Sequence, residues 1–329
     1  MTNYRDSRYN LAMKIHLPNS AFLGNIDSFL RGFDPSSPDT LEITSNQSWI
    51  SIHPVVLSMV AALGLTVRPE QIRFQKPEAR SAHYLVRMKL FDRLQIPCDI
   101  SIQEHAPEGR FIPITQIRSS DELTTFITEM IPLLHKEPEQ AKTIGYIVSE
   151  LVRNVLEHAD TEIGAVLCAQ YYKKTNRICI GIADTGLGIK TTIARSHAAN
   201  TDLDAIRLAL WPGITGTTSK PGGTEQNAGA GLFFIKAIAD VNRDFFAIYS
   251  GSGFYKLLKK KSERLRLNAD PFEDRHSKST QFPYWKGTVV GVDITLDQTR
   301  EFSILLDAIR RAYWDLKMKK MEHKKPRFL

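Results

Sequence analysis

The sequence predicts an α/β protein in which helices cover a sheet whose strands are mainly antiparallel neighbours. Two strand-like segments, residues 163–172 and 177–184, are joined only by the polar turn KKTN. Three more strand-like segments follow towards the end of the chain, at 244–250, 253–260 and 287–296. Helical patterns precede and interrupt these strands but do not alternate with them as regular βαβ units would. A layered α/β arrangement around a largely antiparallel sheet is therefore expected.

The first part of the chain, up to about residue 118, mixes strand and helix patterns. Strands are expected at 10–18, 39–44 and 110–117, and amphipathic helices at 53–64 and 81–94. Pro113 cannot donate a backbone hydrogen bond, so the third of these strands suits the edge of a sheet. This part is predicted to be a smaller α/β module.

Helices dominate the next part of the chain, and the first of them starts with Ser/Asp capping residues. The expected helices are 121–135, about 141–159, 203–210, 231–241 and 300–320. A long Gly/Thr/Pro/Asn-rich segment surrounds the third helix, and a polar insertion at 262–286 precedes the last strand. We therefore expect an N-terminal module at 1–118, a second domain at 119–299, and a C-terminal helix with a basic tail at 300–329.

Length and composition indicate a soluble globular protein. The chain has 329 residues, enough for two domains, and is 42% hydrophobic and 24% charged. Its longest apolar run, residues 53–65, is too short to span a bilayer, and its first residues contain no apolar signal segment. The three cysteines lack metal-ligand spacing and are expected to be ordinary buried residues. Together these features predict a cytoplasmic protein without a membrane partner.

The net charge of +7 is concentrated near the C-terminus, where residues 316–328 read LKMKKMEHKKPRF. A short basic tail is more often a solvated end than a specific binding site. Nucleic acid or an acidic membrane surface is therefore disfavoured as a partner, although nucleic acid stays an open alternative.

A polar stripe runs along the predicted helix at 141–159. Glu150, Asn154 and His158 recur every four residues, so they lie on one side of the helix about one turn apart. Apolar residues occupy the opposite side, and this amphipathicity by itself favours a stripe that faces water. The alternative is a stripe that faces a ligand.

The segment IADTGLGI at 182–189 places Asp184, Gly186 and Gly188 directly after a strand. It is not a dinucleotide fingerprint, because Thr191 replaces the third glycine and a carboxylate would repel a pyrophosphate. A buried carboxylate can instead accept a hydrogen bond from the exocyclic amine of adenine, where guanine presents a carbonyl. The alternative is an ordinary strand-to-loop turn.

Gly229 and Gly231 precede the helix at 231–241, and backbone N–H groups at such a helix start can hold phosphate oxygens. The polar segment 213–226 ahead of them resembles a lid, from which Lys220 could reach phosphates, unless it is a plain exposed lysine. Thr288 opens the last strand and could place a hydroxyl near adenine. No P-loop motif occurs in the sequence.

Taken in order, the segments ELVRN, DTGLGI, GAGLFF and GT resemble the four boxes of the GHKL ATPase superfamily over roughly residues 120–300. This superfamily includes gyrase B, the large heat-shock chaperone ATPases, histidine kinases and mismatch-repair ATPases. The resemblance implies a Bergerat fold, an α/β sandwich that binds ATP, and makes ATP and Mg²⁺ the expected cofactors.

The resemblance also implies roles for individual residues. Asn154 matches the Mg²⁺ ligand, Asp184 the adenine-reading carboxylate, and Glu150 the carboxylate that orients or activates water. The remaining implied contacts to the nucleotide are Gly186, Gly188, Gly229, Gly231, Leu232 and Thr288. His158 either joins the ATP site or is a polar residue at the boundary of the stripe.

Several functions are compatible with this resemblance. The leading hypothesis is Mg²⁺-dependent ATP hydrolysis coupled to lid closure and to regulation of a protein partner. The run SELVRNVLEHA is also similar to anti-sigma-factor serine kinases, in which the glutamate would activate a serine hydroxyl. A non-catalytic nucleotide-sensing module, with ATP stabilising one conformation or a homodimer, is the third possibility.

The N-terminal module loosely resembles a STAS-like or other small α/β unit. It is expected to serve as a sensor, a dimerisation unit or an internal regulatory partner. After residue 300 we expect only about one helix, which would leave no room for the transducer domain of gyrase-like enzymes. That domain normally supplies a lysine that senses the phosphates, so its absence argues against efficient gyrase-like hydrolysis.

Overall fold

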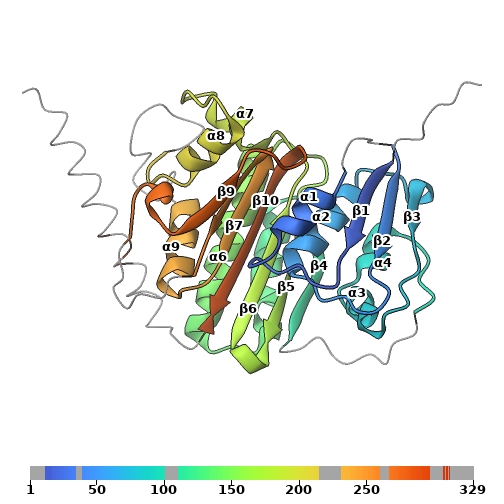
Figure 1. Cartoon of the computed structure of the whole chain (residues 1–329). Coiled ribbons are helices and arrows are strands. Elements are labelled where there is room, and N and C mark those ends of the chain that lie inside the picture. The colour runs from blue at the N-terminus through green and yellow to red at the C-terminus, as the bar shows by residue number, and fades with distance from the viewer. Residues whose placement is uncertain are drawn as a thin grey trace, which may run out of the picture.

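A computed structural model describes residues 12–34, 39–100, 110–214, 231–259 and 267–296, together with Asp307, Ile309 and Arg311 (Figure 1). Most of the expected lid, including Lys220, lies outside these residues. Gly229 and nearly all of the predicted C-terminal helix also lie outside them. Among the described residues, every helix is too short or too polar to cross a lipid bilayer.

The larger sheet has seven strands in the order β4-β5-β6-β10-β7-β8-β9, and all neighbours are antiparallel. The strands are β4 (Phe111–Ile117), β5 (Ala165–Tyr172), β6 (Arg177–Ala183), β7 (Phe246–Gly251), β8 (Gly253–Leu257), β9 (His276–Ser279) and β10 (Trp285–Thr295). The expectation of a largely antiparallel sheet in an α/β fold is confirmed. Strand β9 lies within the polar insertion and was not expected.

Pro113 lies in the edge strand β4, as expected. The register between β4 and β5 shifts between Ile112 and Thr115, so the proline falls at an irregularity where it interrupts no regular ladder.

The smaller sheet is formed by the N-terminal module and has three parallel strands in the order β1-β2-β3. Its strands are β1 (Met13–Leu17), β2 (Leu41–Ser45) and β3 (Ile72–Phe74), of which β3 was not predicted. The helices of this module are α1 (Asp27–Gly32), α2 (Pro54–Gly64), α3 (His83–Arg87) and α4 (Leu90–Leu94).

Two helix predictions in this module need correction. Helix α2 forms where expected, but all eleven of its residues are buried, so it is not amphipathic. The predicted helix at 81–94 is interrupted at Lys89, whose φ of 60° ends α3 and starts α4.

The prediction that the cysteines are buried is confirmed for Cys168 and Cys179 but is wrong for Cys98, which is exposed.

The helices of the second domain begin with α5 (Ser120–Thr125), where the Ser119 hydroxyl accepts a hydrogen bond from the N–H of Glu122. The chain continues as a π-helical and a 3₁₀ turn to Leu134, and His135 then adopts a left-handed conformation with φ of 46°. The other helices are α6 (Pro138–His158), α7 (Gly188–Ile193), α8 (Asp202–Ala209) and α9 (Gly231–Val241).

Both faces of the seven-stranded sheet are buried. Side chains of β5 alternate between two cores: Ala165, Leu167 and Ala169 join the core formed with α6 and α9, while Val166 and Cys168 join the core of the N-terminal module. Figure 1 shows α6 and α9 on one side of the sheet and α2 on the other. The N-terminal module therefore covers the face opposite the helices of the second domain.

A pair of glycines lets α2 approach the sheet closely. Gly181 on β6 and Gly291 on β10 are partners in the sheet register. A Cβ on Gly181 would overlap the backbone of Val55, and one on Gly291 would come within 2.7 Å of the Leu23 side chain. The Ser58 hydroxyl also donates to the Gly181 carbonyl at 2.9 Å.

Because β4 pairs with β5, the large sheet begins at Phe111. The predicted domain border at 118/119 stays a prediction.

Candidate functional site

The polar stripe on α6 is only partly solvent-exposed. Glu150, Asn154 and His158 are each half-buried, whereas their neighbours Arg153 and Glu157 are exposed. The stripe is therefore not a freely solvated face, and its residues lie next to other parts of the domain.

Glu150 lies against the beginning of α9. A Cβ on Gly231, the first residue of that helix, would overlap the Glu150 Oε2 atom. Burial raises the pKa of Glu150; the nearby Arg153 lowers it and Glu157 raises it, and the net result is a raised pKa. The two predicted site residues Glu150 and Gly231 are thus brought together.

Asn154, one turn further along α6, carries an amide nitrogen that is buried and has no hydrogen-bond partner among the described residues. A buried donor without a partner costs free energy, which a bound ligand with an acceptor oxygen can recover.

Asp184 is 1% exposed and stands directly after β6. Its Oδ1 atom accepts a hydrogen bond from the Gly186 N–H at 2.8 Å, and its own N–H donates to the Thr288 carbonyl at 2.9 Å. Burial raises the pKa of Asp184 to about 7, although hydrogen bonds from the backbone of Gly186 and Thr288 lower it in part. A carboxyl group with this pKa changes its charge near neutral pH.

The loop after Asp184 is fixed to both α6 and the sheet. A Cβ on Gly186 would overlap the carbonyl oxygen of Ala159, which also accepts the Leu187 N–H at 2.7 Å. Gly188 has φ of +76°, and a Cβ there would lie 3.0 Å from the Ser250 hydroxyl. The loop therefore joins the end of the α6 stripe to the sheet next to Asp184.

The other predicted residues are less central in the described structure. Thr288 contacts Asp184 through its backbone. Leu232 packs against the core of the second domain. The His158 Nε2 atom is 3.9 Å from Glu157 Oε2, and the side chain is 29% exposed, so His158 resembles a boundary residue. Lys220 and Gly229 lie outside the described residues.

Ser250, Gly287 and Trp285 also support Asp184 and its loop, and the sequence indicated only Gly287 among them, as part of the GT segment. The Ser250 hydroxyl accepts the Ile189 N–H at 2.9 Å and donates to the Gly287 carbonyl at 2.6 Å. Gly287 has φ of +108°, and the Trp285 indole N–H donates to the Asp184 carbonyl at 2.9 Å. Gly287 carried a signal as the residue before Thr288. Ser250 and Trp285 carried none, because no local sequence pattern marks a serine or a tryptophan in a strand for such contacts.

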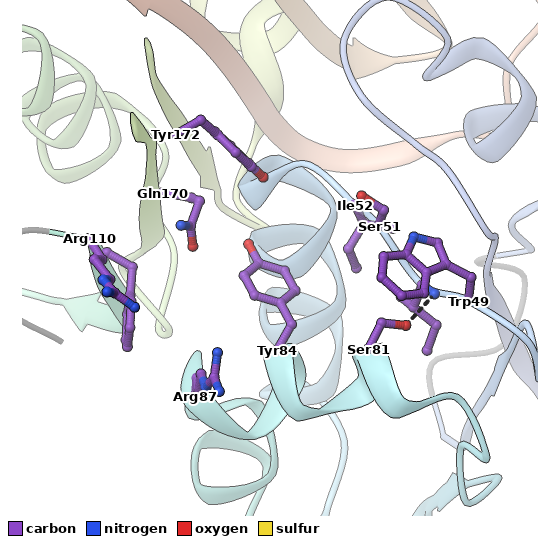
Figure 2. A pocket seen from close by; sticks show the side chains of 11 residues that line it. Trp49, Ser51, Ile52, Ser81, Tyr84, Arg87, Arg110, Gln170 and Tyr172 are labelled. Atoms are coloured by element: carbon purple, nitrogen blue, oxygen red, sulfur yellow. Dashed lines mark hydrogen bonds between the residues drawn. The ribbon is translucent and has the colours of Figure 1, made fainter. Parts of the chain in front are cut away.

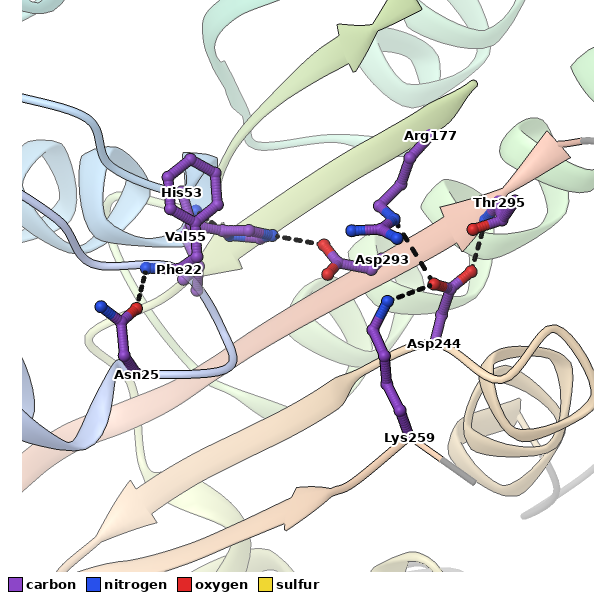
Figure 3. A network of polar contacts seen from close by, with 9 residues as sticks. All are labelled: Phe22, Asn25, His53, Val55, Arg177, Asp244, Lys259, Asp293 and Thr295. Atoms are coloured by element: carbon purple, nitrogen blue, oxygen red, sulfur yellow. Dashed lines mark hydrogen bonds and ion pairs between the residues drawn. The ribbon is translucent and has the colours of Figure 1, made fainter. Parts of the chain in front are cut away.

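A second polar cluster lies where α2 meets the sheet (Figure 3). His53, Cys179 and Asp293 are buried, and one potential ligand atom of each lies within 4.8 Å of the others, as in a metal site. However, the His53 Nδ1 atom accepts the Val55 N–H at 3.0 Å, so the ring carries its proton on Nε2 and donates it to Asp293 Oδ1 at 3.1 Å. With neither ring nitrogen offering a free lone pair, the cluster fits an inter-module hydrogen bond better than a metal centre.

Comparison with known families matches residues 117–243 to the model described as histidine kinase-like ATPase domain. Comparison with curated proteins and with solved structures gave no match. The matched residues include α6 with its polar stripe, the Asp184 loop and the beginning of α9. Residues 117–243 are therefore similar to a histidine kinase-like ATPase domain, which supports the resemblance of this part of the chain to the ATP-binding GHKL superfamily.

Proposed function

We propose that this protein binds ATP with Mg²⁺ between α6, the Asp184 loop and α9, and hydrolyses it with the help of Glu150. The observation that carries this proposal is the buried Asp184 carboxyl group, held at the end of β6 by the backbone of Gly186 and Thr288. Buried carboxyl groups with strongly shifted pKa values cluster at ligand-binding and catalytic sites.

In this proposal Asp184 reads the base. Its carboxylate would accept a hydrogen bond from the exocyclic amine of adenine. The Thr288 hydroxyl would join the same contact, because the Thr288 carbonyl accepts the Asp184 N–H at 2.9 Å. A guanine carbonyl at that place would face a second acceptor, so the site prefers ATP to GTP.

Asn154 and Glu150 would act at the phosphate end. The Asn154 Nδ2 atom, buried without a partner among the described residues, would donate to a phosphate oxygen. The side-chain oxygen of Asn154 would face Mg²⁺, an ion that prefers oxygen ligands. Bound Mg²⁺ would neutralise phosphate charge. Glu150, whose raised pKa makes it a better proton acceptor, would orient and activate the attacking water.

A second candidate function uses the same site with another nucleophile. The spacing of Glu150, Asn154 and His158 also fits a serine kinase of the anti-sigma type, in which Glu150 would activate a hydroxyl of a protein partner. Either function would couple nucleotide binding and lid closure to a regulatory partner. A non-catalytic nucleotide sensor would bind ATP without consuming it.

Calorimetry of ATP binding tests the shared part of these proposals. We expect Asp184→Asn to weaken ATP binding by at least tenfold, because the amide presents donors to the adenine amine. Asp121→Asn, which changes an exposed aspartate of α5, is the matched control and should bind ATP as the unaltered protein does. Equal affinity in all three proteins would refute the adenine-reading role.

The fate of the γ-phosphate separates the three functions. Incubation with γ-labelled ATP should release free phosphate if the protein is an ATPase, and should label a protein of the lysate if it is a kinase. Glu150→Gln should retain ATP binding and lose either activity by about 100-fold or more. Retained turnover in this variant would contradict the role of Glu150.

A further inference from the structure

A pocket of about 280 Å³ lies between the N-terminal module and the β4–β5 edge of the large sheet (Figure 2). It is separate from the Asp184 site, which lies beyond β6 next to α6. The pocket residues on which the inference depends are Trp49, Tyr84, Arg87, Arg110, Gln170 and Tyr172. The first three belong to the N-terminal module and the last three border or belong to the sheet, so a ligand here would touch both parts.

The charged side chains of this pocket are both cationic. Arg87 and Arg110 line it, and no acidic side chain is among its lining residues in the described part of the chain. The Arg87 Nε atom is buried and has no hydrogen-bond partner there. A guanidinium nitrogen buried in this way lacks an acceptor, and an anion in the pocket would supply it.

Two tyrosine hydroxyl groups add neutral donors. The Tyr84 hydroxyl is buried and also has no partner among the described residues. Burial, followed by the neighbouring Tyr172, raises the pKa of Tyr84 well above its ordinary value, so the hydroxyl keeps its proton. In Figure 2 this hydroxyl points towards Gln170 and Tyr172, into the space that the lining residues enclose.

Aromatic side chains give the pocket apolar walls. Trp49 is 57% exposed, although it is one of the largest apolar side chains of the chain. The next residue is fixed, because the Ile50 N–H donates to the Ser81 hydroxyl at 2.7 Å. The Tyr172 ring packs in an edge-to-face contact against the Phe22 ring, with the two ring centroids 5.9 Å apart. Figure 2 draws Trp49 on one side of Tyr84 and both arginines on the other, which gives the pocket an aromatic and a cationic end.

We propose that this pocket binds a small aromatic anion, a carboxylate or a phosphate ester, with its charged group on Arg87, Arg110 and the Tyr84 hydroxyl. The volume, near the lower limit of about 300 Å³ for small-molecule sites, suits a compact ligand. Because the pocket residues come from both parts of the chain, the ligand stabilises the docked arrangement of the N-terminal module. The module then acts as a sensor of this ligand.

Binding of four probes tests the class of ligand. Indole-3-acetate and phenyl phosphate should raise the melting temperature of the full chain and bind saturably in calorimetry. The neutral indole-3-acetamide and inorganic phosphate should each bind at least tenfold more weakly, because each lacks one half of the recognised structure. Whichever aromatic anion binds more tightly identifies the charged group. Equal binding of the amide, or no binding of either aromatic anion, would overturn the proposal.

Variants of the pocket assign the binding to these side chains. Arg87→Gln, Tyr84→Phe and the more exposed Arg110→Gln should each weaken the tighter probe, by about tenfold to a hundredfold for the arginines and less for the tyrosine. Arg73→Gln, which removes an exposed guanidinium on β3 outside the pocket, is the matched control. Asp184→Asn should leave probe binding unchanged, which separates this pocket from the ATP site.

Circular dichroism spectra identify any variant that fails to fold. If Arg87→Gln fails to fold, Arg110→Gln still tests the proposal. Unchanged affinity in the folded arginine variants would overturn the proposal.

Discussion

At the scale of single residues, Asp184 combines a role in the proposed site with a cost to the fold. Its carboxyl group is 1% exposed, and burial raises its pKa to about 7. In the unfolded chain the same group ionises near pH 3.9. Between these two values the native protein binds more protons than the unfolded chain does, so this residue makes the native state less stable as the pH rises.

Asp184→Asn should therefore stabilise the nucleotide-free protein, and by more at higher pH. The gain in the free energy of unfolding over the unaltered protein should grow by about 2 to 3 kcal/mol between pH 5 and pH 7.5 and then level off. Urea denaturation across this pH range measures the difference, with Asp121→Asn as the control. A gain that does not vary with pH would show that Asp184 is ionised throughout.

Gly231 is the second residue whose identity bears on the chemistry. A Cβ at this position would overlap the Glu150 carboxylate, the far end of a flexible side chain that can move away. Gly231→Ala should therefore fold with a stability changed by less than about 1 kcal/mol, because alanine also favours the helix. Turnover at saturating ATP should fall by about tenfold or more, because Glu150 is displaced.

Steady-state ATPase assays measure this effect, and Gly32→Ala is a suitable control because a Cβ there would meet nothing within 4 Å. Normal turnover in Gly231→Ala would mean that the observed position of Glu150 is not the active one.

The sequence indicated those site residues that share a local motif, and it missed those that act from elsewhere in the chain. Asp184 and Gly186 are two residues apart, and Glu150 and Asn154 are one helical turn apart, so their patterns are visible in short segments. Ser250 and Trp285 reach the same loop from other strands, and their contacts depend on how the sheet is assembled.

At the scale of helices and strands, hydrophobic periodicity predicted most elements but not their surroundings. Helix α2 is buried all round because it lies between the small sheet and the large one, and its run VVLSMVAALG has no polar side. The left-handed Lys89 that divides α3 from α4 carries no glycine or proline signal. Strand β9 lies at the edge of the sheet and reads as polar because only one neighbour pairs with it.

The contact of α2 with strands β6 and β10 depends on Gly181. Gly181→Ala should lower the free energy of unfolding by about 2 kcal/mol or more, because the new methyl group would overlap backbone atoms of Val55, which cannot move as a side chain can. Gly145→Ala in α6 is the matched control: the nearest atom would be 4.0 Å away, and a helical alanine should be neutral or stabilising by up to about 1 kcal/mol. Chemical denaturation gives both values, and a neutral Gly181→Ala would contradict the close approach of α2.

At the scale of the whole molecule, the N-terminal module and the large sheet share one core. An antiparallel sheet with one wet face shows alternating polar and apolar residues, whereas AVLCA in β5 and ICIGIA in β6 are apolar on both sides. These runs were a signal that a second layer covers the sheet, but which segment supplies it cannot be read from periodicity. The docking also includes the ion pair between Lys256 of β8 and Asp27 of α1.

The hydrogen bond between His53 and Asp293 provides the test of this shared core. Burial raises the pKa of Asp293, but the hydrogen bond from His53, with help from Cys179 and Arg177, outweighs it and keeps the pKa low. His53→Ala leaves a buried carboxylate without its main partner and should destabilise the protein by about 3 kcal/mol. The double variant His53→Ala/Asp293→Asn should recover part of this loss, since no unpaired charge then stays buried.

Native-state hydrogen exchange then shows whether the loss is global. Amides of β2 in the N-terminal module and of β6 in the large sheet should open with the same free energy, and His53→Ala should lower both by the same amount. If β2 alone became more exchangeable while β6 kept its protection, the module would be an independent domain resting on the sheet. Equal changes in both strands would mean that any ligand or partner that binds the N-terminal module also changes the stability of the sheet that carries Asp184.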